Sequence, residues 1–228
     1  MREIVLDTET TGLNPLQGDR MVEIGCVEII NRLPTGKAYH CYFNPERDMP
    51  EEAERVHGLS EEFLSDKPLF TQEVDNFLEF IKGDPLVIHN APFDMGFINA
   101  ELTRAGYQNL AMARVVDTLP MARKKFPGAP ASLDALCKRF EIDLSKRDLH
   151  GALLDAELLA EVYLELCGGR QPDLDISQQA QGQDAGAGLM QDRTFRKARS
   201  FPPTEEELRA HEKFLEKVEN PLWKKRAN

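Results

Sequence analysis

The sequence predicts an α/β fold in which a mixed five-stranded sheet is flanked by helices and followed by a linker and a helical tail. Two observations predict the sheet. A hairpin pattern comes first, and short apolar runs then alternate with segments of helical spacing up to residue 169. This order is typical of a mixed sheet with helices on both faces. A third observation, a sharp change of composition near Gly168-Gly169, predicts where the domain ends.

The predicted strands are short apolar runs bounded by turn residues. They cover residues 3–6, 21–31, 37–43, 86–88 and 114–117. The second and third runs flank Leu33-Pro34-Thr35-Gly36, a turn sequence that predicts an antiparallel hairpin.

Four helices are predicted in the domain from capping residues and apolar spacing. The first has Thr71 as its N-cap and stops at Gly83. The second covers 92–104, with proline in its first turn. Ser132 caps the third, which runs to about residue 140, and the fourth covers 151–166.

The chain divides into three predicted parts: a domain over 1–169, a linker over 170–192 and a tail over 193–228. The linker is rich in Gln, Gly and Ala, so it buries too little apolar surface to repay the entropy of ordering. The tail holds ten basic and six acidic side chains, whereas the whole chain has a formal charge of −11. The acidity therefore belongs to the domain, which disfavours a protein that holds long nucleic acid by its own field.

A helix is predicted in the tail, from the capping box Thr204-Glu205-Glu206-Glu207 to about residue 219. Apolar residues follow 3–4 spacing on one side, with aromatic residues nearby: Leu208, His211, Leu215, Val218 and Leu222, then Phe201, Phe214 and Trp223. An isolated helix cannot bury such a stripe, so it either folds back on the domain or fills a groove on a partner. The linker before it favours a partner.

Acidic residues follow two of the predicted strands. Asp7 and Glu9 are two residues apart, and such residues in an extended chain share a face, with roughly 6.6–6.8 Å between their Cα atoms. Paired carboxylates repel and raise each other's pKa unless a cation neutralises them. Asp94 is predicted in the first turn of the 92–104 helix, where the dipole favours a negative charge. Each motif alone is also explained by a solvated strand end or by helix-start electrostatics.

His150 and Asp155 form a third motif. Five helical steps place them about 140° apart, so they cannot share one helix face. They converge only if His150 lies in the loop and Asp155 lies in the first or second turn of the following helix, a break that Gly151 permits. Alone, the pair is equally consistent with two surface residues.

Together, the three motifs lie at the edge where open α/β sheets place their sites. Four carboxylates and one histidine without cysteine suit hard cations, so we expect two Mg²⁺ or Mn²⁺ ions as cofactors. Two such ions about 3.5–4 Å apart are the usual apparatus for in-line attack on a phosphodiester. His150 is the expected general base, because imidazole titrates near neutral pH.

In this order, Asp-x-Glu, Asn-x-x-x-Asp and His-x-Ala-x-x-Asp resemble the DEDDh family of 3′→5′ exonucleases, which has a ribonuclease-H-like fold. The resemblance extends through His57-Gly58-Leu59, the segment 132–137 and the end of the domain. It implies four metal ligands and one catalytic base: Asp7, Glu9, Asp94 and Asp155, with His150. It also implies five residues around the 3′-terminal nucleotide: Thr11, Gly12, Leu13, His57 and Phe93. Glycine admits close backbone approach, while Leu and Phe pack against bases without reading sequence.

The resemblance implies a proofreading exonuclease that removes mispaired deoxynucleotides from a single-stranded or frayed DNA 3′ end. It implies the alpha subunit of a replicative DNA polymerase as the partner of 193–228, with a theta-like subunit and a sliding clamp as further contacts. Two alternatives stay open: an RNA 3′-end-trimming exonuclease, because the motifs do not read the 2′-hydroxyl, and a catalytically inactive polymerase-stabilising subunit. The apolar runs are too short to span a bilayer, the N-terminus does not resemble a signal peptide, and the cysteines are scattered. We therefore expect a cytoplasmic protein with no membrane contact.

Overall fold

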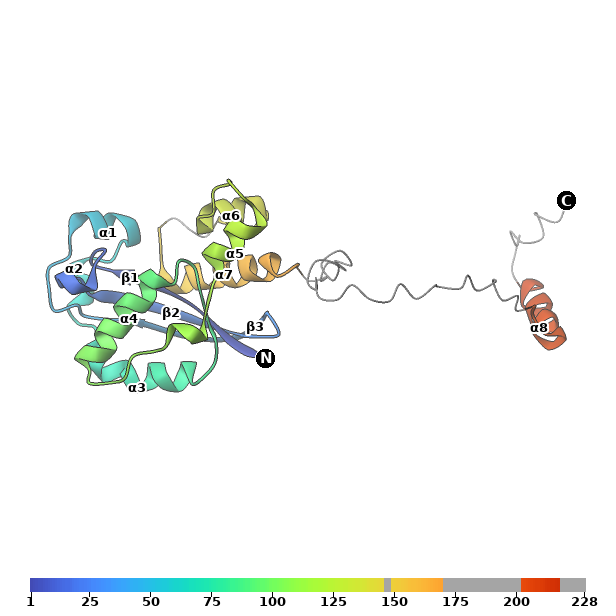
Figure 1. Ribbon diagram of the computed structural model, residues 1–228, viewed down its shortest axis with the longest axis horizontal. Helices are drawn as coiled ribbons and strands as arrows, with labels where there is room; N and C mark the ends of the chain where they lie inside the picture. Colours follow the sequence, from blue (N-terminus) through green and yellow to red (C-terminus); the bar gives the residue numbers. More distant parts are fainter. Residues whose placement is uncertain (146–148, 170–201, 218–228) are drawn as a thin grey trace, which may run out of the picture. The chain divides into compact units, whose positions relative to one another are not determined.

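The computed structural model describes residues 1–145, 149–169 and 202–217 (Figure 1). The chain divides into two compact units, Met1–Asp175 and Ile176–Asn228. The predicted linker over 170–192 lies outside the described residues, as do 193–201 and 218–228 of the predicted tail.

The first unit is built on a mixed five-stranded sheet, as predicted. Its strands are β1 (Arg2–Thr10), β2 (Met21–Ile30), β3 (Leu33–Tyr42), β4 (Leu86–Ile88) and β5 (Val115–Asp117). They lie in the order β3-β2-β1-β4-β5. β1 pairs antiparallel with β2 and parallel with β4, so the hairpin and the parallel half of the sheet meet at β1.

Helices cover both faces of the sheet (Figure 1). α3 (Phe70–Ile81) and α4 (Pro92–Arg104) share one apolar cluster with it, and α7 (Ala152–Leu166) shares a second cluster on the other face. α5 (Thr118–Lys125) and α6 (Leu133–Arg139) pack with α7 in a third cluster. The shorter helices are α1 (Glu51–His57), α2 (Glu61–Leu64) and the 3-10 turns η1 (Pro15–Gln17) and η2 (Met112–Arg114).

The side chains of β1 alternate between these two faces. Ile4 and Leu6 join the cluster with α3 and α4, whereas Val5 joins the cluster with α7. Continued along the strand, the alternation turns Asp7 and Glu9 toward the α7 face and Thr8 toward the α4 face. The pleat thus decides which helix each polar side chain of β1 meets.

β1 is longer than the predicted strand over 3–6. Its ladder to β2 continues, with Asp7 opposite Gly25 and Glu9 opposite Glu23. The apolar run ends at Leu6, but β2 still offers backbone partners, and this pairing keeps the chain extended. Asp7 and Glu9 therefore lie within the strand and not after it, which corrects the prediction.

The hairpin is confirmed, but its predicted turn is wrong. Asn31 and Arg32 form the turn, with φ of 51° and 68°. Two consecutive left-handed residues make a tight turn whose twist suits a hairpin. The predicted turn residues Pro34 and Gly36 lie in β3, where the register with β2 shifts. A proline is tolerated there because β3 is an edge strand.

The four helices predicted in the domain are all present. α4 has the predicted bounds, and α6 and α7 follow Ser132 and Gly151. Thr71 is not the N-cap of α3: the N-cap is Leu69, two residues earlier, and the Gln72 side chain accepts a hydrogen bond of 2.9 Å from the Leu69 backbone N–H. α1, α2 and α5 were not predicted, because they are seven, four and eight residues long and carry no sustained apolar stripe.

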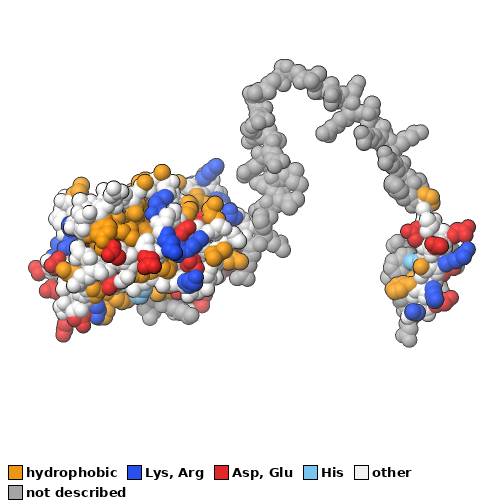
Figure 2. All heavy atoms as spheres, turned by 90° about the horizontal axis from the view of Figure 1, so that it is seen from below, with side chains coloured by type: hydrophobic (Ala, Val, Ile, Leu, Met, Phe, Trp, Pro, Cys, Tyr) orange, Lys and Arg blue, Asp and Glu red, His pale blue; other side chains and the backbone are white. Residues whose placement is uncertain are grey.

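The second unit contains α8 (Glu205–Leu215), which starts at the predicted capping box. Thr204 Oγ1 accepts from the Glu207 backbone N–H at 3.3 Å, and the Glu207 carboxylate accepts from the Thr204 N–H at 2.8 Å. Leu208 and Phe214 are exposed, and Figure 2 shows charged side chains of both signs on the same helix. Two residues of the predicted apolar stripe, Val218 and Leu222, lie outside the described ranges, as do the nearby aromatic residues Phe201 and Trp223. None of the described helices is long and apolar enough to cross a membrane.

Candidate active site

Asp7 and Glu9 enter the site from β1, on the face that carries α7. Both are partly buried, and Asp7 lies opposite Gly25 of β2. A Cβ at Gly25 would lie 2.3 Å from the backbone nitrogen of Leu153, so only glycine lets the first turn of α7 approach the sheet this closely. That approach brings the residues at the start of α7 beside Asp7.

Asp94 enters from the first turn of α4 and is 3% exposed. The Thr8 hydroxyl, on the α4 side of β1, donates a hydrogen bond of 2.8 Å to Asp94 Oδ1. The turn before α4 is held from β5, because the Asp117 carboxylate accepts the backbone N–H groups of Asn90 at 3.1 Å and Ala91 at 3.2 Å. Asn90 adopts a left-handed φ of 63° there. Asp117 thus positions the Asp94 turn, a role that no motif in the sequence marks.

His150 and Asp155 converge across the start of α7, as their spacing requires. His150 precedes the helix and Asp155 lies in its first turn, with 3.2 Å between His150 Nδ1 and Asp155 Oδ2. The loop is tied to α1, because the His150 backbone N–H donates to the Val56 carbonyl at 3.1 Å. The side chain of His150 is 48% exposed and that of Asp155 is 4% exposed. The imidazole can therefore exchange protons with solvent while the carboxylate stays inside.

One cavity of about 200 Å³ brings the four acids and His150 together. Among the described residues, no Lys or Arg lines it. Burial, followed by the carboxylates of Asp94 and Glu9, raises the pKa of Asp7 well above its ordinary value. Burial also raises the pKa of Asp94 to about 7, although the Thr8 hydrogen bond opposes this rise. Bound protons or cations are therefore needed to neutralise the negative charge of these carboxylates.

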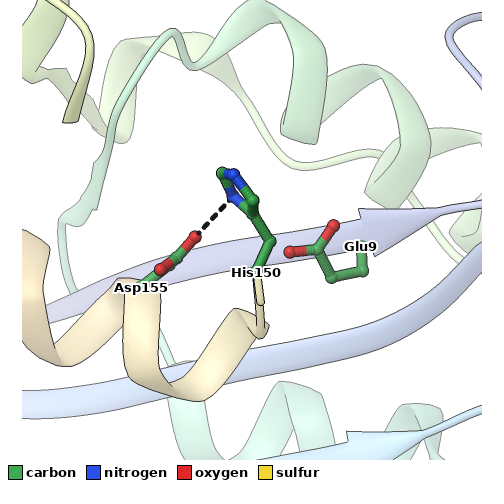
Figure 3. A group of neighbouring side chains, drawn as sticks. All are labelled: Glu9, His150 and Asp155. Atoms are coloured by element: carbon green, nitrogen blue, oxygen red, sulfur yellow. Dashed lines mark hydrogen bonds and ion pairs between the residues drawn. The ribbon is translucent and has the colours of Figure 1, made fainter. Parts of the chain in front are cut away.

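The donor set fits a divalent cation. Glu9, His150 and Asp155 each offer a ligand atom within 4.8 Å of the others, and Figure 3 shows the Glu9 side chain reaching from β1 toward the His150 ring beside Asp155 of α7. Asp7 and Asp94 lie outside this close group but line the same cavity. Carboxylate oxygens dominate the set, as Mg²⁺ and Mn²⁺ prefer, and a divalent charge would stabilise the ionised form of Asp7, which burial and the neighbouring carboxylates disfavour.

A second cavity, of about 540 Å³, adjoins the acidic one and shares Thr8, Glu9 and Phe93 with it. All five residues expected around a 3′-terminal nucleotide line this second cavity: Thr11, Gly12, Leu13, His57 and Phe93. The wall opposite β1 comes from the unpredicted helix α1 and the residue before it, through Pro50, Glu52, Ala53 and Val56. This wall was not predicted from the sequence, because the residues of α1 show no apolar periodicity.

The residues on the β1 side of the second cavity are held in different ways. Leu13 is 84% exposed, whereas Thr11 is buried and its hydroxyl accepts the Arg20 backbone N–H at 3.0 Å. Gly12 packs on Asp19, whose carboxylate oxygen would lie 2.3 Å from a Cβ at that position. The contacts of Thr11 and Gly12 therefore hold in place the loop that exposes Leu13.

His57 and Phe93 close the second cavity from α1 and α4. His57 is buried, and its Nδ1 accepts the Leu59 backbone N–H at 3.0 Å, so the neutral ring carries its proton on Nε2. Burial lowers the pKa of His57, which favours this neutral form. Phe93 is half-buried, with its ring centroid 5.1 Å from that of Phe97. Both residues therefore pack in the core and face the cavity as well.

Comparison with known proteins extends these observations. The family described as exonuclease matches residues 4–163. The chain is 52% identical over 222 residues to the DNA polymerase III subunit epsilon of Rickettsia conorii, covering 96% of each protein. It is 46% identical over 236 residues to that of Escherichia coli, covering 98% of this chain and 97% of the relative.

Solved structures of exonucleases share the fold. Exonuclease X in complex with 5′ overhanging duplex DNA matches with a TM-score of 0.58 at 24% identity, over 73% of this chain and 91% of that one. Exonuclease I matches with a TM-score of 0.65 at 18% identity, over 75% of this chain and 41% of that one. These matches confirm the predicted ribonuclease-H-like α/β fold of the first unit.

Proposed function

The chain belongs to the exonuclease family, in which its relatives are DNA polymerase III epsilon subunits, and we propose that it is a 3′→5′ proofreading exonuclease of the replicative DNA polymerase. The observation that carries the proposal is the convergence of four carboxylates and His150 on one cavity, beside a second cavity of nucleotide-binding size. The reaction is hydrolysis of the last phosphodiester of a single-stranded or frayed DNA 3′ end, which releases a deoxynucleoside 5′-monophosphate.

The exonuclease family depends on divalent metal ions, and the acidic cavity is the place for them. We assign two Mg²⁺ or Mn²⁺ ions to four ligands: Asp7, Glu9, Asp94 and Asp155. When bound, such ions stabilise charge at the scissile phosphate and acidify a water molecule. The chain itself holds the ligands in place, since Thr8 orients Asp94 and the first turn of α7 carries Asp155.

His150 acts as the general base that takes the proton of the attacking water. Its Nδ1 lies 3.2 Å from Asp155 Oδ2. In the tautomer that donates Nδ1–H to this carboxylate, Nε2 carries the lone pair that accepts the proton. Because the ring is half exposed, the proton then passes to solvent.

The second cavity receives the 3′-terminal nucleotide. Leu13 and Phe93 offer apolar surface for a base of any sequence, as a proofreading enzyme requires. Thr11, Gly12 and His57 complete the wall next to the acidic cavity. Because the two cavities share Thr8, Glu9 and Phe93, a nucleotide bound in the second cavity would lie beside the proposed metal ligands.

The protein works as a subunit of DNA polymerase III, as its relatives are named. A formal charge of −11 opposes tight binding to a duplex, so the polymerase must hold the DNA. We assign the DNA polymerase III alpha subunit to the tail over 193–228, where α8 exposes Leu208 and Phe214. A theta-like subunit and the sliding clamp are further proposed partners, and the complex functions in the cytoplasm. Deleting 193–228 should abolish co-purification with the alpha subunit and preserve nuclease activity; retained co-purification would refute this assignment.

Paired cleavage assays test the proposed function. The full chain, native or Asp155→Ala, is offered 3′-mismatched primer–template DNA and a short RNA, each with Mg²⁺ and with chelator. We expect release of deoxynucleoside monophosphates by the native protein with Mg²⁺ alone. Absence of metal-dependent cleavage would refute the enzyme, whereas preference for RNA would identify an RNA-trimming exonuclease instead.

A further inference from the structure

Three cavities of the first unit form a continuous row. The acidic cavity shares Thr8, Glu9 and Phe93 with the nucleotide cavity, as described above, and shares His89 and Asn90 with a third cavity. The nucleotide cavity and the third cavity have no lining residue in common within the described part of the chain. The acidic cavity therefore lies between them.

The third cavity has a volume of about 590 Å³ and differs from the acidic one in charge. It is lined by the turn after β4, by α5 and by the segment before α6: His89, Asn90, Leu119, Arg123, Ala129, Pro130, Ala131 and Ser132. Among the described residues of this lining, Arg123 alone carries a fixed charge and none has a carboxylate. A cavity with this lining suits an anionic ligand.

The charge of Arg123 is available to a ligand. Its side chain is exposed and makes no hydrogen bond or salt bridge in the described part of the chain. Burial lowers the pKa of His89 and the charge of Arg123 acts in the same direction, so the neutral form of this ring is favoured in the cavity wall. The nearby Asp117 carboxylate is already engaged by three backbone N–H groups, those of Asn90, Ala91 and Leu119.

We propose that the third cavity is a subsite for the DNA strand on the 5′ side of the scissile bond, in which Arg123 contacts a backbone phosphate. The inference rests on the proposed function, since it places the terminal nucleotide in the nucleotide cavity and the scissile phosphate at the acids. A strand bound in that way must leave the acidic cavity on the side away from its own 3′ end. The third cavity occupies that side, and it carries the cation that a phosphodiester needs.

This subsite gives the acidic domain a local means of holding single-stranded DNA. Arginine pairs well with phosphate because its planar group donates two parallel hydrogen bonds. A phosphate contact fixes the position of the strand and carries no sequence information, which suits an enzyme that must remove any base. Asn90 and Ser132, which also line the cavity, are polar residues without charge.

The test compares full-length Arg123→Gln with the matched control Lys124→Gln, an exposed neighbour on α5 that does not line the third cavity. One substrate is a single-stranded DNA oligonucleotide; the other is the p-nitrophenyl ester of thymidine 5′-monophosphate, which has no upstream strand. For the oligonucleotide, Arg123→Gln should lower kcat/KM about 5-fold or more, as expected for loss of one charged phosphate contact. The slope of log kcat/KM against log salt should also flatten, by roughly 0.7. Ester hydrolysis, and both activities of Lys124→Gln, should stay unchanged.

A neutral methylphosphonate linkage identifies the phosphate. Placed at the linkage next to the scissile bond, or one further upstream, it should slow the native protein by about the factor that Arg123→Gln costs. Combined with Arg123→Gln, it should cause no further loss. Equal loss on both substrates would overturn the subsite and indicate damage to the acidic cavity. Unchanged oligonucleotide cleavage by Arg123→Gln would overturn the subsite and leave the proposed function standing. Failure of the native protein to cleave either substrate with metal would refute the proposed function, and the subsite with it.

Discussion

Replacing Asp94 with asparagine should stabilise the metal-free protein at neutral pH and abolish its nuclease activity. Asp94 is 3% exposed, and burial raises its pKa from 3.8 to about 7. Asparagine has the same shape and no charge. Its side-chain oxygen can still accept the Thr8 hydroxyl, which lies 2.8 Å from Asp94 Oδ1. Asp94→Asn therefore removes a buried charge and keeps this hydrogen bond.

The sign and the size of the effect follow from the linkage between pKa and folding. Because the folded-state pKa of Asp94 lies above the unfolded value, the stability it contributes is complete below pH 3.8 and is lost as pH rises through about 7. At about 1.36 kcal/mol for each pKa unit, a rise from 3.8 to about 7 amounts to on the order of 4 kcal/mol. For a protein of this size, that difference corresponds to roughly 8–16 °C in Tm.

Thermal unfolding in chelator, at about pH 4 and about pH 8, measures the difference. The two proteins should unfold at similar temperatures near pH 4, where the native carboxyl is protonated, and Asp94→Asn should be the more stable near pH 8. Mg²⁺ should raise the Tm of the native protein by mass action and that of the variant less. A variant less stable than the native protein near pH 8, or a gap that does not change with pH, would refute the reasoning.

Three further predictions concern single side chains. His150→Ala should lower kcat by on the order of 10²–10⁴-fold and leave Tm nearly unchanged in thermal melts, because its side chain is 48% exposed; a loss below tenfold would contradict its role as base. Gly25→Ala should destabilise the fold by roughly 1–3 kcal/mol in urea titrations, because its Cβ would lie 2.3 Å from the Leu153 backbone nitrogen; native stability would show that α7 can shift at no cost. Arg20→Met should cost about 1.5–3 kcal/mol in the same assay, since Arg20 Nε donates at 2.7 Å to Glu101, whose side chain is 2% exposed and keeps its pair with Arg104 at 2.9 Å. Adding Glu101→Met should recover part of that loss, and a double variant worse than Arg20→Met would contradict the explanation.

Much of the framework could be predicted from local sequence signals. α4 was predicted to the residue because proline starts it and glycine follows it, and its first turn fixed the place of Asp94. The five predicted strands follow the apolar runs, and α7 begins at the glycine that His150 and Asp155 need in order to converge. These features depend on residues that are close together in the chain.

The missed features depend on contacts between distant segments. β1 extends to Thr10 because β2 pairs with it, although the apolar run ends earlier. Asn31 and Arg32 form the hairpin turn at positive φ; asparagine is common in such turns, but arginine is not, and Gly36 is a stronger turn signal nearby. In the sequence, Gly25 does not differ from any other glycine in a strand. Its role follows only from the fold, because a Cβ at this position would lie 2.3 Å from the backbone of α7. Asp117 becomes a positioning residue only when β5 reaches the turn before α4.

We propose that the acidic cavity is a site for two divalent ions, held by the four carboxylates of the three motifs. Anomalous diffraction from crystals of the full chain grown with Mn²⁺ and a deoxynucleoside monophosphate would locate these ions. Two manganese peaks should lie in the cavity bordered by Asp7, Glu9, Asp94 and Asp155, with the nucleotide in the adjoining cavity beside Leu13. A cavity without manganese, in crystals whose nucleotide is bound elsewhere, would contradict the account.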